Sequence, residues 1–128
     1  MNLEKLMSLK DGWYDGAGLA PDKDRLEEVW RRLFKSWPDG LSRPCVVPTQ
    51  EGGLLFSWEN MLAQPTVDYD MKTDRAWFHA WALDGGDIER EFVVTDEVVA
   101  EEMWVFAKKV LDEARTAVFH KKNLEDRT

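Results

Sequence analysis

Few side chains in this sequence have the types and spacing that catalysis needs. The single cysteine, Cys45, and the histidine His79 are the only pair that could supply a thiolate and a general base. Cys45 lies in a valine-rich run between two prolines, where a cysteine usually serves as a small buried apolar residue. We therefore expect no catalysis from this pair and interpret the protein as a non-enzymatic one.

Metal ligands are equally sparse along the chain. His79 and His120 are far apart, with no other histidine or cysteine at a ligating interval, so no zinc motif is present. Asp68, Asp70 and Asp74 have part of the spacing of a calcium loop but lack its glycine and final glutamate. The sequence predicts neither a metal site nor a cofactor.

The glycine-rich residues 12–21 do not predict nucleotide binding. They have no preceding strand and no Lys-Ser/Thr pair, and two aspartates beside the glycines would repel phosphate. An alternative function remains for this segment. A pocket beneath the loop, lined by Trp13, Tyr14 and His79, would make the protein a small ligand-binding domain or an enzyme.

Charge is the strongest signal in the sequence. The formal net charge is −8, and residues 84–102 alone hold eight acidic residues and one basic residue. Such a block repels nucleic acid and attracts a basic surface if it lies on one side of the fold. The structural alternative is that these acids only begin a helix and protect an edge strand.

The elements that position these residues follow from the hydrophobic spacing. We predict a short helix and glycine-rich loop at 1–21, a helix at 24–37 capped by Asp24, a sheet at 44–94, a helix at 95–119 capped by Thr95, and a frayed tail at 120–128. This order predicts one α+β domain. Its antiparallel meander of four or five strands packs against two main helices as a two-layer sandwich.

Residues 75–83 form the central strand of that predicted sheet. Large side chains alternate along one side, at Trp77, His79 and Trp81, while Phe78 stands between alanines on the other. The small residues would let another element approach closely. A strand that is apolar on both sides needs cover on both.

The preceding hairpin determines which side faces the core. If residues 72–74 form the turn, Tyr69 pairs with Trp77 and Val67 pairs with His79. The aromatic column then belongs to the core, and the opposite side becomes the open one.

We expect the function to be recognition of another protein. Helices lying side by side would cover only one face of the sheet, which leaves the other face and the acidic block exposed. The predicted partner-binding residues are Asp68, Asp70, Phe78, Asp84, Asp87, Glu89, Glu91, Asp96, Glu97, Glu101 and Glu102. The expected partner is a protein with a basic surface, such as a nuclease or a nucleic-acid-binding complex, and not nucleic acid itself. A homodimer formed through the sheet is a third interpretation.

The sequence also predicts a cytoplasmic protein. It has no apolar run long enough for a bilayer and no basic-then-apolar leader. A lone cysteine fits a reducing compartment.

Two motifs resemble those of small uncharacterised bacterial proteins. Residues 12–21, Gly-Trp-Tyr-Asp-Gly-Ala-Gly-Leu-Ala-Pro, are similar to their "GWDG-x-G-A-x-P" loop, with Tyr14 in place of an acidic residue. Residues 44–59, Pro-x-x-x-Pro-Thr-x-x-Gly-Gly-x-x-x-x-Trp-Glu, are similar to their hairpin. This resemblance implies an α+β fold and a bacterial or phage origin. In composition the chain is also similar to small acidic phage inhibitors of bacterial defence, immunity proteins and antitoxins, which implies an inhibitor.

Overall fold

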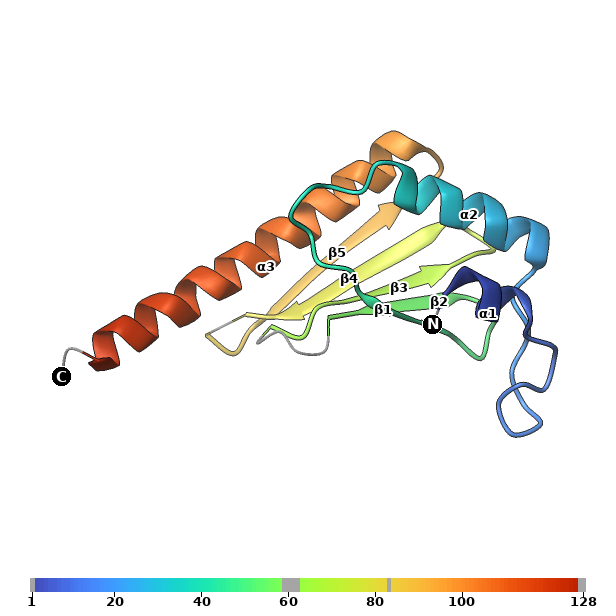
Figure 1. The fold of residues 1–128 in the computed structure, drawn as a ribbon, viewed down its shortest axis with the longest axis horizontal. Coiled ribbons are helices and arrows are strands. Elements are labelled where there is room, and N and C mark those ends of the chain that lie inside the picture. The colour runs from blue at the N-terminus through green and yellow to red at the C-terminus, as the bar shows by residue number, and fades with distance from the viewer. Residues whose placement is uncertain (1, 59–62, 83, 127–128) are drawn as a thin grey trace.

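The computed structural model describes residues 2–58, 63–82 and 84–126, with side chains in the last helix described as far as residue 114 (Figure 1). The elements are α1 (Leu3–Met7), α2 (Lys23–Lys35), β1 (Cys45–Pro48), β2 (Leu54–Ser57), β3 (Thr66–Asp70), β4 (Arg75–Trp81), β5 (Asp87–Val93) and α3 (Glu97–Asp126). The five strands form one antiparallel sheet in the order β1-β2-β3-β4-β5, so the predicted α+β meander is confirmed. Parts of three predicted segments lie outside the described residues: residue 1 of the segment 1–21, residues 59–62 and 83 of the sheet at 44–94, and residues 127–128 of the tail.

Helices cover one face of this sheet. Figure 1 shows α2 and α3 lying across the same side, and α1 sits beside the sheet near α2. Trp104 of α3, the largest fully buried side chain, packs against Phe34 of α2 and Phe56 of β2, with ring centroids 6.3 and 5.5 Å away. Its Nε1 donates to the carbonyl oxygen of Leu33 at 2.6 Å. One buried indole therefore joins both helices to the sheet.

Both main helices begin at a different cap from the predicted one. The N-cap of α2 is Asp22, whose carboxylate accepts from the backbone N–H of Arg25 at 2.9 Å, two residues before the predicted Asp24. In α3 the carboxylate of Asp96 accepts from the N–H of Val99 at 3.0 Å. The helix then continues to Asp126, where the sequence predicts a frayed tail from residue 120. No glycine or proline interrupts residues 97–126, so nothing in the chain stops the helix earlier.

The β3–β4 hairpin has a register one residue away from the predicted one. Tyr69 pairs with Ala76 and not with Trp77, because the turn is the four residues 71–74. Asp74 ends this turn with a φ of 59°, in the left-handed region that aspartate tolerates better than most residues. The hydroxyl of Tyr69 donates to its carboxylate at 2.7 Å, which holds the longer turn in place.

This register reverses the two faces of β4. Val67 pairs with Phe78, which is fully buried, and the Phe78 ring lies edge-to-face with Phe106 of α3 at 5.1 Å. The alanines beside Phe78 are the small residues that let the helix approach. The prediction that Phe78 is exposed is therefore wrong, as is the prediction that the aromatic column lies in the core. The outward side of β4 carries Arg75, Trp77, His79 and Trp81.

Asp74 also connects the β3–β4 turn to α2. Its Oδ1 accepts from the guanidinium groups of Arg25 and Arg32, and the side chains of Arg32 and Asp74 are only 14% and 16% exposed. Burial lowers the pKa of Arg25, but the contacts with Asp74 outweigh this and raise it. Burial, followed by the hydrogen bond to Asp74, raises the pKa of Tyr69 well above its usual value. These four side chains fix the hairpin against the helix.

Candidate functional site

The sheet face turned away from α2 and α3 is the candidate functional site, and we call it the open face. Trp77 and Trp81 of β4 are 44% and 49% exposed there, and Val93 of β5 is half-exposed. Residues 12–20 do not cover these positions, because Leu19 hydrogen-bonds to Gln50 in the β1–β2 turn at 2.8 Å. Two half-exposed tryptophans on one strand are unusual for a surface with no partner.

Each aromatic residue on the outward side of β4 has a carboxylate directly opposite it on β5. Side chains at such positions have Cβ atoms about 4.5–5.5 Å apart. We call the six residues the aromatic–acid ladder: Trp77 with Glu91, His79 with Glu89, and Trp81 with Asp87. The arrangement arises because β4 and β5 both alternate between the two faces of the sheet and their outward residues are paired, so the three rings of β4 lie in a row beside the three acids of β5.

His79 occupies the middle of the ladder. Its ring centroid lies 5.5 Å from that of Trp77 and 5.1 Å from that of Trp81, the second contact being edge-to-face. Its Nε2 lies 3.4 Å from Oδ1 of Asp87, and its side chain is 18% exposed. The donor atoms of His79, Asp87 and Glu89 all lie within 4.8 Å of one another. This group is the one place in the described part of the chain where three such ligands meet.

Acids on β3 extend the negative charge across the open face. Asp68 lies opposite Trp77, and desolvation, followed by the charges of Glu51 and Asp70, raises the pKa of its carboxyl group. These acids help to line a cavity of about 450 Å³ that also reaches Trp77. Among the described residues, the base that pairs with the ladder is Arg75, which lies 3.3 Å from the Glu91 carboxylate with both side chains more than half exposed, and Lys72 also lines the cavity. The acids of β3 therefore add to a negative field centred on the ladder.

Comparisons of the chain with protein-family models, with curated proteins and with solved structures found no match. Within the described residues, no helix is both long and apolar enough to cross a membrane. The functional interpretation therefore rests on the geometry of the open face.

The acidic block of residues 84–102 is divided between different sides of the molecule. Three of its members, Asp87, Glu89 and Glu91, lie on the open face. Arg90 points to the helix side, where its guanidinium lies over the rings of Phe92 and Phe106 and 3.3 Å from the Glu102 carboxylate. Alternation along β5 separates these neighbours, so the predicted single acidic surface does not form.

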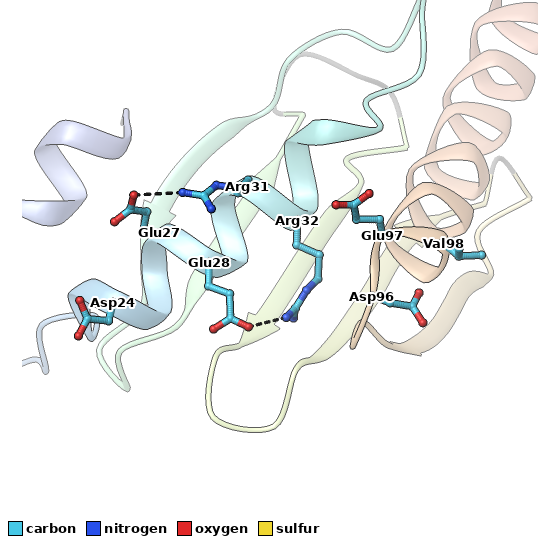
Figure 2. Close-up of a pocket in the computed structure, with 8 residues that line it drawn as sticks. All are labelled: Asp24, Glu27, Glu28, Arg31, Arg32, Asp96, Glu97 and Val98. Carbon is cyan, nitrogen blue, oxygen red and sulfur yellow. Dashed lines mark hydrogen bonds and ion pairs between the residues drawn. The ribbon is translucent and has the colours of Figure 1, made fainter.

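The remaining acids of the block have local roles. Asp84 accepts from the N–H of Gly86 at 2.9 Å in the β4–β5 turn, and Glu101 is exposed on α3. Asp96 and Glu97 begin α3 at a wide cleft of about 800 Å³ beside α2. Figure 2 shows the residues that line this cleft: Asp24, Glu27, Glu28, Arg31, Arg32, Asp96, Glu97 and Val98.

The cleft carries paired charges of both signs. Arg31 lies 3.3 Å from Glu27 and Arg32 lies 2.8 Å from Glu28, as the dashed lines in Figure 2 mark. Glu97 pairs at 3.1 Å with Lys35, which is not drawn in Figure 2. Because three of its five acids, Glu27, Glu28 and Glu97, already have cationic partners, this cleft is a weaker candidate than the open face for attracting a basic molecule.

The alternative pocket beneath residues 12–21 does not have its predicted lining. A cavity of about 460 Å³ lies beside Leu19, but its described lining includes none of Trp13, Tyr14 and His79. The indole of Trp13 instead donates to the carbonyl oxygen of Leu19 at 3.0 Å, which closes the loop on itself, and Tyr14 is exposed.

Cys45 is exposed at the start of the edge strand β1, and not buried as predicted. The register aligns it with Ser57, Thr66 and His79 in one row across four strands. Neighbouring strands lie about 4.8 Å apart, so the row separates Cys45 from His79 by roughly 14 Å. The two residues cannot form a catalytic dyad.

Proposed function

We propose that the protein binds a basic surface of another protein with its open face and so inhibits that partner. The observation that carries the proposal is the aromatic–acid ladder, in which each exposed ring lies directly opposite a carboxylate. A cleft of a nuclease or of a nucleic-acid-binding complex is the expected target. Such clefts carry the arginines that a negative, aromatic surface recognises.

The ladder offers an arginine two interactions at once. Its guanidinium can stack on a tryptophan face, which contributes about 0.5–2 kcal/mol depending on desolvation, and can donate to the adjacent carboxylate. Rungs two residues apart along β4 are spaced by roughly 6.7 Å. Basic side chains on alternate positions of an extended segment have the same spacing, so several rungs can be filled together.

The charges of the open face favour the binding of a cationic partner. Desolvation, followed by the charges of Glu51 and Asp70, raises the pKa of Asp68, and a partner's cation would stabilise the ionised carboxylate. The exposed pair of Arg75 and Glu91 contributes only about 0–1 kcal/mol, as such surface pairs do. Little stability is lost when an incoming arginine takes the place of Arg75.

Titration calorimetry against purified nucleases and nucleic-acid-binding proteins with basic clefts tests the proposal. We expect one of these proteins to bind, with an affinity that falls by about tenfold or more between low and high salt. Binding that is independent of salt would contradict the electrostatic mechanism. A panel with no binder at all would contradict the proposed target class.

Two variants of equal charge change locate the interface. Glu89→Lys with Glu91→Lys reverses two rungs of the ladder, while Glu101→Lys with Glu113→Lys reverses two exposed acids of α3. We expect the first variant to lose at least about tenfold in affinity and the second to lose much less. Equal losses would mean that net charge alone, and not the open face, drives association.

A further inference from the structure

We propose that His79, Asp87 and Glu89 form a binding site for one divalent transition-metal ion of the zinc class. The inference goes beyond the proposed function, since it concerns the chain without any partner. Three ligand atoms from two adjacent strands lie within 4.8 Å of one another. They are an imidazole nitrogen and two carboxylate oxygens, a set of ligands that zinc accepts.

The distances are close to those that coordination requires. Zinc holds such ligands at about 2.0–2.2 Å in a tetrahedron, which places neighbouring donor atoms roughly 3.4 Å apart. Nε2 of His79 and Oδ1 of Asp87 are already 3.4 Å apart. Glu89 is exposed, so a rotamer change can bring its carboxylate inward by the remaining distance.

The surroundings of His79 hold the central ligand in position. Trp77 and Trp81 lie on either side of the imidazole, and its side chain is 18% exposed. Binding an ion therefore costs little further side-chain entropy at this residue. A nitrogen ligand also favours zinc-class ions over magnesium or calcium, which prefer oxygen ligands throughout.

A coordination position remains for a fourth ligand. Three protein ligands with an open position are typical of zinc sites that bind water or a substrate atom. His79 also lines a cavity of about 380 Å³. Its other lining residues are Ser57, Trp58, Gln64, Pro65, Thr66 and Trp81. The cavity lies beside the imidazole of His79, and neither Asp87 nor Glu89 lines it.

Calorimetric titration of the untagged full chain with zinc chloride tests the site. We expect one ion per chain with a dissociation constant in the micromolar range, and a loss of at least about tenfold in affinity for His79→Ala. His120→Gln and Cys45→Ser are the matched controls, because they remove the other histidine and the thiol, and they should bind as the unaltered chain does. The expected cobalt complex has the intense visible absorption of a four-coordinate ion, which His79→Ala should abolish.

Two results would overturn the proposal. One is the absence of saturable zinc binding by the unaltered chain up to millimolar metal. The other is unchanged binding in His79→Ala. If His79→Ala fails to fold, Asp87→Asn with Glu89→Gln supplies a second variant that keeps the side-chain volumes. All these titrations omit the protein partner, so their outcome is independent of the proposed inhibition.

Discussion

Trp77 and Phe78 are adjacent in the chain and lie on opposite faces of β4. Phe78 is fully buried against Phe106, whereas Trp77 is 44% exposed beside Asp68 and Glu91. Trp77, the larger of the two side chains, therefore contributes less than Phe78 to the packing of the core. Its place on the open face is accounted for by the proposed recognition of a partner.

Truncation of these two residues should separate stability from binding. Phe78→Ala leaves a cavity in the core and should lower the free energy of unfolding by about 3–5 kcal/mol. Trp77→Ala removes a half-exposed ring and should lower it by about 1 kcal/mol or less, while weakening association with the basic partner. Urea denaturation of both variants measures the difference, and equal losses would contradict the assigned faces.

Asp68 should make folding stability depend on pH in a particular direction. Because desolvation raises its pKa in the folded state above the unfolded value of 3.8, ionisation costs folding stability. That cost is absent below the unfolded pKa, grows as the pH rises from the unfolded to the folded pKa, and is complete above the folded pKa. Asp68→Asn should therefore stabilise the protein at pH 7, with the gain disappearing below the unfolded pKa.

Urea denaturation of Asp68→Asn at several pH values checks this expectation. Glu113→Gln, at an exposed position of α3, is the control for a general change of net charge. A gain for Asp68→Asn that persists at acid pH would show a cause other than the ionised carboxylate.

At the scale of elements, Asp74 is the one carboxylate of the β3–β4 turn that pairs with α2, and Nε of Arg25 also donates to the carbonyl oxygen of Met71 at 2.9 Å. Asp74 accepts from Tyr69 and from two arginines of α2, Arg25 and Arg32. Without it, two largely buried guanidinium groups would lose their shared partner.

Asp74→Asn removes the charge while keeping a residue that tolerates the left-handed backbone. We expect the free energy of unfolding to fall by about 1–3 kcal/mol, since two partly buried guanidinium groups lose one of their carboxylate partners while Glu28 still pairs with both. Asp70→Asn is the matched control, because Asp70 is exposed and its contact with the N–H of Lys72 can also be made by an amide. Similar losses in both variants would show that Asp74 is only a turn residue.

The contacts of Asp74 show why the elements could be predicted from the sequence while the register of the β3–β4 hairpin could not. Periodicity places α2, α3 and all five strands, because the alternation of apolar residues is local information. The hairpin register is not local. It depends on Asp74 reaching α2, about 40 to 50 positions away, and this contact selects a four-residue turn over the three-residue turn that spacing alone favours.

For the whole molecule, the order of elements was enough to predict one helix layer on an antiparallel meander. The open face could be predicted to exist, but its residues could not be assigned while the register was wrong. The sequence predicts Asp68 and Asp70 on the outside, where the structure has them, but it exchanges the sides of Phe78 and the tryptophans. Counting acids in residues 84–102 likewise could not show that β5 turns them in different directions.

The candidate metal ligands illustrate the same gap. His79, Asp87 and Glu89 match no sequence motif, because they come from two strands joined by a turn. Strand pairing across that turn was the available signal. Once β4 and β5 are paired, Glu89 must lie opposite His79.

Because helices cover only one face of the sheet, substitutions on its two faces have different consequences for the protein. Along β4, odd-numbered positions lie on the open face, where the proposed partner would bind, and even-numbered positions are buried under the helix layer. Substitutions at Trp77, His79 or Trp81 can change what is recognised without repacking the core. If the open face binds a partner as proposed, the set of partners can change through single substitutions while the core stays the same.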